Sequence, residues 1–229
     1  MSDQTMPVGK WEFDETVTAV FDDMLARSIP EFKTMRAAVS DIACEFLPNG
    51  GVVLDAGCSR GGALAAVIAR RPDCTAVGLE ISEPMRQSAA DRFKHDSNVT
   101  ILRWDLRNGI PDQRVDVTLA VLTLQFTPIE YRQQIIGSIR ERTNGPLILV
   151  EKVLGRGHQI DQKMVDLYYR MKRSHGYTQE QIDTKRHSLE GQLVPLTAAG
   201  NETLLKDCGY QSVDCFWRWM NFAAWIALP

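Results

Sequence analysis

The sequence has no long apolar run. No stretch of its 229 residues contains the roughly 18 consecutive apolar residues that span a bilayer. The opening segment, MSDQTMPVGKWEFDE, has neither an apolar centre nor a small-residue cleavage site, so it does not fit a secretory signal. We therefore expect no membrane partner and a cytoplasmic location.

Cysteine is scarce and irregularly placed. There are five cysteines, an odd number, and no two of them form a C-x-x-C pair. A small disulfide scaffold needs an even, dense set, and a zinc ribbon needs closely paired thiols. The sequence therefore predicts neither of these structures, and we expect no metal centre.

An excess of positive charge is also missing. Lys and Arg total 26 against 29 Asp and Glu, which gives a formal net charge of −3. Proteins that hold nucleic acid across a broad surface are usually basic. We expect no direct nucleic-acid partner. Hydrophobic residues at 44% and charged residues at 24% are typical of a globular protein with a substantial core.

Strand and helix patterns alternate through the middle of the chain. Apolar stripes first predict helices within 17–25 and over 32–46. The region 50–152 then alternates, with strands expected at 52–55, 75–80, 99–104, 115–124 and 146–152 and helices at 62–71, 82–95 and 128–142. Such alternation predicts an α/β fold with a mostly parallel, doubly wound sheet.

The pattern changes after Lys152. Helices are expected at 160–174, 178–190 and 197–207, followed by a strand-like stretch at 211–228 with Asn221 as a candidate turn. We predict one domain over 1–229, made of N-terminal helices (1–49), a core (50–152), a helical insertion (153–196) and a C-terminal helix with strands (197–229). The aromatic residues near the C-terminus suit either a core strand pair or a dimer interface.

The glycine loop in VVLDAGCSRGG fits three chemistries. Gly57-Cys58-Ser59-Arg60-Gly61 matches the G-x-S-x-G turn of a serine nucleophile, which would need a histidine and an acid elsewhere. A dinucleotide-binding turn also fits, although Ser59 replaces the glycine that approaches a pyrophosphate. The third chemistry is binding of S-adenosyl-L-methionine, which has no pyrophosphate and so needs no glycine at that position.

Three acids favour the third interpretation. Asp55, Glu80 and Asp105 each end a successive predicted strand, so they should line one edge of a parallel sheet. There they could bind the ammonium group, the ribose hydroxyls and the adenine amino group of S-adenosyl-L-methionine. The alternative is that each acid merely caps a neighbouring helix.

Several motifs carry a family resemblance. They are WEFDETVTAVFDDMLARSIP, DAGCSRGGA, TLQF, VEK, HGY, IDTKRHSLE and NF, spread from about Trp11 to Leu228. With them the chain resembles the carboxy-S-adenosyl-L-methionine synthase family. The resemblance implies a Rossmann-like class I methyltransferase fold with a C-terminal antiparallel strand, and a homodimer.

The resemblance also implies a reaction. Prephenate loses carbon dioxide and water to leave phenylpyruvate, and the methyl carbon of S-adenosyl-L-methionine captures the carbon dioxide through a sulfonium ylide. The product is carboxy-S-adenosyl-L-methionine, from which a second enzyme modifies the wobble uridine of tRNA. Either the cofactor or this carboxylated form is the expected ligand, and prephenate or another carboxylic acid is the expected substrate.

By the same resemblance, Arg186 binds the carboxylate beside the sulfonium and is the expected catalytic residue. A guanidinium fork suits a carboxylate. Lys185 and His187 could assist, but neighbours on a helix point about 100° apart, so we do not expect both to do so. The remaining cofactor contacts implied are Gly57, Cys58 and Ser59 at the amino-acid part, Glu80 and Ile81 at the ribose and adenine, and Asp105 and Leu106 at the adenine ring.

Three positions depart from the family pattern. Phe32 stands in place of a tyrosine, Val121 in place of an asparagine, and Glu80 in place of an aspartate. Two hydrogen-bonding groups near the ligand are thus lost. The sequence therefore leaves two alternatives open, namely methyl transfer to a small acidic metabolite held by Arg186, and a protein that binds an S-adenosyl ligand without turnover.

Overall fold

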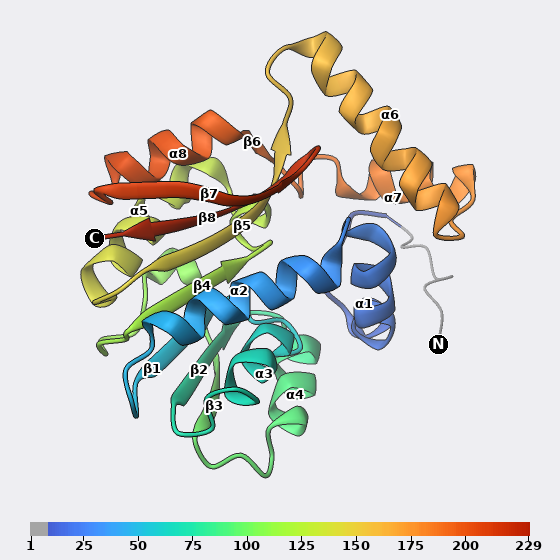
Figure 1. The fold of residues 1–229 in the computed structure, drawn as a ribbon. Coiled ribbons are helices and arrows are strands. Elements are labelled where there is room, and N and C mark those ends of the chain that lie inside the picture. The colour runs from blue at the N-terminus through green and yellow to red at the C-terminus, as the bar shows by residue number, and fades with distance from the viewer. Residues whose placement is uncertain (1–8) are drawn as a thin grey trace.

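A computed structural model describes residues 9–229 and shows one large sheet. The sheet has eight strands, of which seven lie in the order β3-β2-β1-β4-β5-β8-β7 while β6 pairs with β5 (Figure 1). The strands are β1 (Val52–Ala56), β2 (Thr75–Glu80), β3 (Val99–Arg103), β4 (Val117–Val121), β5 (Leu147–Leu154), β6 (Leu196–Thr197), β7 (Ser212–Trp219) and β8 (Phe222–Leu228). The expectation about a signal segment falls partly on residues 1–8, which lie outside the described residues.

The strand pairing confirms a mostly parallel, doubly wound sheet. β1 pairs in parallel with β2 and β4, β2 with β3, and β4 with β5. β8 runs antiparallel to β5, and β7 runs antiparallel to β8. The strand order reverses between β1 and β4, and ligands of such sheets bind outside the carboxyl ends of the strands at this point.

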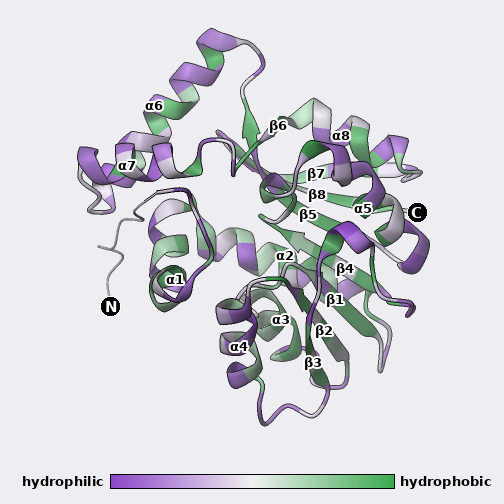
Figure 2. Ribbon diagram, turned by 180° about the vertical axis from the view of Figure 1, so that it is seen from behind, coloured by the Kyte–Doolittle hydropathy of each residue, from purple (hydrophilic) through white to green (hydrophobic). Residues whose placement is uncertain are grey.

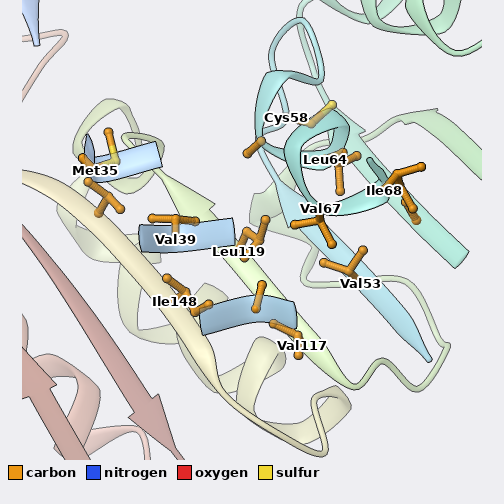
Figure 3. Packing of buried hydrophobic residues seen from close by; sticks show 14 of the residues in the cluster. Met35, Val39, Val53, Cys58, Leu64, Val67, Ile68, Val117, Leu119 and Ile148 are labelled. Atoms are coloured by element: carbon orange, nitrogen blue, oxygen red, sulfur yellow. The ribbon is translucent and has the colours of Figure 1, made fainter. Parts of the chain in front are cut away.

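Alternation along each strand divides the core between the two faces. Val53 of β1 packs in the cluster that contains helices α2 (Phe32–Phe46), α3 (Gly62–Ile68) and α4 (Glu83–Arg92). Its neighbour Leu54 packs in the opposite cluster with helices α5 (Ile129–Arg142) and α8 (Ala198–Asp207). Figure 3 shows Met35 and Val39 of α2 beside Leu119 and Ile148 of the strands. Because successive side chains of a strand point to opposite faces, each strand contributes apolar contacts to the helices on both faces of the sheet.

The remaining helices gather beyond the carboxyl edge of the sheet. α1 (Glu15–Ser28) packs Phe21 and Met24 with Trp11 in a separate apolar cluster. α6 (His158–Ser174) and α7 (Gln179–Leu189) stand out from the sheet on the same side as α1 (Figure 1). The Trp11 amide donates to the Ser188 carbonyl at 2.9 Å, which joins the N-terminal segment to α7. In Figure 2 the strands are mostly green, whereas α4 and α7 carry much purple.

The C-terminal aromatic residues form part of the strand pair. Trp225 and Phe222 of β8 are buried in the core, and Phe216 and Trp217 of β7 pack partly against it. The chain reverses between β7 and β8 at Met220 and Asn221, as the candidate turn predicts. Whether β7 also meets a second copy stays a prediction.

One strand is shorter than the apolar pattern predicts. The expected strand 115–124 becomes β4, which ends at Val121. Leu122 takes a φ of +59°, in the left-handed region, and a 3-10 turn η2 (Leu124–Phe126) follows. The apolar run continues because this turn is itself packed inside the protein, with Leu124 buried. Within residues 9–229 no helix is both long and apolar enough to cross a membrane.

Candidate active site

The loop after β1 packs tightly against the turn after β4. Gly57 has a φ of +87°, and a Cβ added there would lie 2.3 Å from the Thr123 side chain. The Gly57 and Cys58 amides both donate to the Leu79 carbonyl at 2.9 Å. Only glycine allows this conformation without strain together with this approach. The two loops therefore form a continuous wall at the switch point of the sheet.

The TLQF and VEK motifs hold that wall in place. The Leu124 amide donates to the Glu151 carboxylate at 2.9 Å, and the Lys152 amide donates to Gln125 Oε1 at 2.8 Å. Burial raises the pKa of Glu151 to about 8, while Arg132 and the backbone amides oppose the shift. The two motifs therefore lock the turn after β4 to the end of β5.

Two cavities, each of about 300 Å³, are lined by residues of this wall. Both are lined by Gly57 and Ser59, so they meet at the glycine loop. We call them the inner cavity and the outer cavity. The inner cavity holds the predicted site residues Phe32, Asp55, Cys58, Val121 and Arg186. The outer cavity holds the predicted site residues Glu80, Ile81, Asp105 and Leu106. Each of the eleven side chains or glycines predicted from the sequence thus lines at least one cavity.

The acids of the outer cavity have partners in their own chain. Glu80 accepts hydrogen bonds from the Ser59 and Ser82 amides at 2.9 and 2.8 Å. Asp105 accepts from the Arg107 amide at 2.9 Å and forms an ion pair with its guanidinium. This contact lowers the pKa of Asp105 below its ordinary value. Both acids therefore act as local caps as well as lining the cavity.

Asp55 in the inner cavity differs from these two acids. It is 2% exposed, and its Oδ1 has no hydrogen-bond partner within residues 9–229. Burial raises its pKa to about 7; Arg36 opposes this shift and Glu80 adds to it. A buried carboxylate without a donor is costly, and a cationic ligand group would remove that cost. Capping does not explain Asp55.

Several basic side chains line the inner cavity. Arg186 lies at the mouth, with its side chain 46% exposed and Glu190 at 3.5 Å. Lys185 beside it is buried, with its Nζ 5.1 Å from the Trp11 ring centroid. Lys152 of β5 and Lys172 of α6 also line the cavity, each facing the Tyr168 ring. Lys185 and Arg186 therefore both reach the cavity, whereas His187 does not line it.

Sequence reasoning missed several residues of the inner cavity. Arg36 reaches it from α2, Lys152 from β5 and Lys172 from α6. Lys152 stands inside the VEK motif, which could have drawn attention to it. Arg36 and Lys172 lie in ordinary helical stretches, and only the packing of their helices reveals their direction.

The serine-nucleophile interpretation is not supported by this geometry. No histidine of the described chain lines either cavity. The Ser59 amide is committed to Glu80, and burial raises the pKa of the neighbouring Cys58 thiol far above its ordinary value. Neither side chain has the base that activates a nucleophile.

Known proteins match this chain over nearly its whole length. The carboxy-S-adenosyl-L-methionine synthase of Methylococcus capsulatus is 34% identical over 94% of this chain and 92% of its own. The enzyme of the same name from Wolinella succinogenes is 36% identical over 95% of this chain and 93% of its own. The chain belongs to the carboxy-S-adenosyl-L-methionine synthase family. A general methyltransferase domain model also matches residues 53–144. This match contradicts the interpretation of the glycine loop as a dinucleotide-binding turn.

Solved structures agree with the family's fold. An O-methyltransferase family protein from Burkholderia thailandensis has a TM-score of 0.67 at 18% identity, covering 94% of this chain. Human N-acetylserotonin methyltransferase in complex with SAM has a TM-score of 0.64 at 13% identity, covering 93%. This chain spans about 60% and 55% of those two chains. At such identity the likeness establishes the class I methyltransferase fold alone.

The two cavities suit the cofactor of this family. S-adenosyl-L-methionine is elongated, with an adenosine end and an amino-acid end, and the cavities adjoin at the glycine loop. Asp55 offers a buried carboxylate without a partner, as an ammonium group requires. The residues present therefore fit an S-adenosyl ligand, and the protein is a transferase that uses it. The contact of each residue with the cofactor stays a prediction.

Proposed function

We propose that this protein converts S-adenosyl-L-methionine and prephenate into carboxy-S-adenosyl-L-methionine and phenylpyruvate, with release of water. Family membership supports the carboxylated product. The observation that carries the substrate class is the basic lining of the inner cavity, which includes Lys152, Lys172, Lys185 and Arg186 among aromatic side chains. A dianionic acid with a six-membered ring matches both the charge and the apolar walls.

The cofactor supplies a sulfonium that acidifies its methyl group. The protein's own task is to place an anion beside that group and to keep bulk water away. Arg186 offers a planar fork for one carboxylate at the cavity mouth. Lys172 and Lys185 are 4% and 6% exposed, so their charges act in a poorly screened environment and attract a second carboxylate. Trp11, Phe13 and Phe126 close the apolar side of the cavity.

The test uses purified protein, the cofactor and prephenate labelled with ¹³C in the ring carboxylate. We expect labelled carboxy-S-adenosyl-L-methionine and phenylpyruvate in equal amounts by mass spectrometry. Methyl transfer to an acid would instead release S-adenosylhomocysteine without a labelled sulfonium. Tight ligand binding without either product would identify a non-catalytic protein. Each of these two results contradicts the proposal.

Arg186→Ala provides the matching variant. We expect at least a 100-fold loss of carboxylated product and a larger loss of affinity for carboxy-S-adenosyl-L-methionine than for S-adenosyl-L-methionine. The control is Arg173→Ala on α6, because Arg173 is exposed, bonds Gln179 and lines neither cavity. Equal weakening of both ligands by Arg186→Ala would show that Arg186 only supports the fold.

A homodimer in the cytoplasm, supplying a tRNA-modifying enzyme, completes the proposal. Half-buried Trp217 and Trp219 on the edge strand β7 support a dimer, because aromatic residues are enriched at interfaces. Light scattering during gel filtration should give twice the mass of the chain, and a monomeric mass across a wide concentration range would refute the dimer.

A further inference from the structure

Arg36 reaches the glycine loop from α2, and the family resemblance assigns no role to it. It stands on α2, one helical turn after Phe32, and its guanidinium carbon lies 4.4 Å from the centroid of the Phe32 ring. This stacked pair at i and i+4 holds the guanidinium in one direction. The side chain therefore reaches the cavity in a fixed position.

The loop leaves space for this guanidinium. A Cβ added at Gly62 would lie 2.5 Å from Arg36 Nη1 and 3.0 Å from Nη2. The guanidinium thus occupies the volume that any other residue at position 62 would fill. Since Arg36 and Asp55 both line the inner cavity, one cationic and one anionic group flank the start of the loop.

Arg36 and Asp55 do not form a hydrogen bond or an ion pair with each other. Arg36 Nε and Asp55 Oδ1 are both buried without a hydrogen-bond partner in the described chain. Across residues 9–229, no ion pair or hydrogen bond joins Arg36 to Asp55 or to any other acid. Their charges are nevertheless close enough to affect each other, because Arg36 counteracts the rise in the pKa of Asp55.

The other nearby acid is already engaged. Asp22 of α1 lines the inner cavity and attracts Arg36, but its carboxylate forms ion pairs with Arg60 at 3.0 Å and Arg92 at 3.5 Å. Burial lowers the pKa of Arg36 below its ordinary value, which reflects the cost of holding this charge without a partner. A half-buried guanidinium whose Nε has no acceptor is a site for an anion.

We propose that Arg36 and Asp55 together bind the α-amino-acid end of the S-adenosyl ligand, with Arg36 on its carboxylate and Asp55 on its ammonium group. A zwitterionic head group supplies both missing partners at once, whereas a simple anion or cation supplies only one. Phe32 is then a positioning residue, since its ring supports the guanidinium. This inference concerns binding alone and does not depend on which reaction follows.

The test is calorimetry with two ligands, S-adenosyl-L-methionine and its decarboxylated form, which lacks only the α-carboxylate. The wild-type protein, freed of copurified ligand, should bind the complete ligand at least about 10-fold more tightly, the range for a hydrogen bond to a charged group. Arg36→Met should weaken the complete ligand about 10- to 100-fold and the decarboxylated ligand less than about 3-fold. Arg36→Lys should fall between, because it keeps the charge and loses the fork.

The matched control is Lys33→Met. It removes one positive charge from the same helix, but Lys33 is exposed and lines neither cavity, so both affinities should stay unchanged. Equal loss of both ligands in Arg36→Met would overturn the proposal by showing that Arg36 only shapes the loop, and no loss would overturn it as well. If Arg36→Met does not fold, the test is the ratio of the wild-type affinities for the complete and the decarboxylated ligand. Equal wild-type affinities overturn the proposal.

Discussion

The outer cavity contains acids that are already engaged, whereas the inner cavity contains one acid and one arginine with a buried atom that has no partner in the described chain. Glu80 and Asp105 accept hydrogen bonds from backbone amides or from Arg107. Asp55 and Arg36 each bury an atom without a partner. Acids that already have partners keep their positions without a ligand, whereas unpartnered charges are stabilised when a ligand supplies the missing partner. The outer cavity is thus built into the fold, whereas the inner cavity has charged groups that a ligand can still satisfy.

Gly57→Ala should disturb both cavities, because Gly57 lines each of them, and should have the largest effect. The new Cβ would lie 2.3 Å from the Thr123 side chain, so the wall shared by the two cavities must move. We expect at least a 100-fold loss of affinity for S-adenosyl-L-methionine in calorimetry. Gly209→Ala is the control, since Gly209 has a similar φ of +89° with nothing within 4 Å of its Cβ position. Comparable losses in both variants would mean that backbone strain, not close approach, is responsible.

Replacing one acid from each cavity should change stability in opposite directions. The pKa of Asp55 is raised by burial, so the native state binds more protons than the unfolded state between about pH 4 and 7, and stability falls as pH rises through that range. Asp55→Asn should therefore raise the melting temperature of the ligand-free protein by several degrees at pH 8 and little at pH 4.

Asp105→Asn is the corresponding variant in the outer cavity, and its melting temperature is compared with that of Asp55→Asn. The pKa of Asp105 is lowered by Arg107, so its contribution is present above the unfolded pKa of about 4 and lost as pH falls through the lower folded value. This variant should lower the melting temperature at pH 8 by one or two degrees, because the pair is partly exposed. Shifts of the same sign in both variants at pH 8 would contradict the distinction between the cavities.

Phe32→Leu should have the smallest effect. It removes the ring that lies 4.4 Å from the Arg36 guanidinium and keeps an apolar side chain. A stacking contact of this kind contributes about 0.5–1 kcal/mol, so the affinity for S-adenosyl-L-methionine should fall about 2- to 5-fold. Phe46→Leu, at the exposed far end of α2, should leave the affinity unchanged. An unchanged affinity in Phe32→Leu would remove Phe32 from the positioning role.

The core of the fold was predictable because its patterns are local. Alternating strands and helices over 50–152 give the parallel sheet, and the residues at the strand ends then meet at one edge. Asp55, Glu80 and Asp105 could be placed at the cavities for this reason. Helices α6 and α7 were predictable as well, because their sequence patterns follow one another without a strand between them.

The missed features depend on contacts between distant parts of the chain. β4 ends early because Leu122 turns into the left-handed region where Glu151 binds the next turn, and no periodicity records that bond. Arg36 and Lys172 are long side chains whose direction depends on how α2 and α6 pack. The environment of each acid could not be predicted from the sequence either, because it depends on the fold. Asp55 is buried with an unpartnered oxygen, whereas Glu80 and Asp105 accept hydrogen bonds.

The backbone hydrogen bond between Trp11 and Ser188 has a consequence for how the chain matures. The segment around Trp11 leaves the ribosome long before α7 is made, because strands β1 to β5 are translated in between. Because Trp11 lines both cavities and is bonded to α7, the walls of both cavities are complete only after α7 has been made.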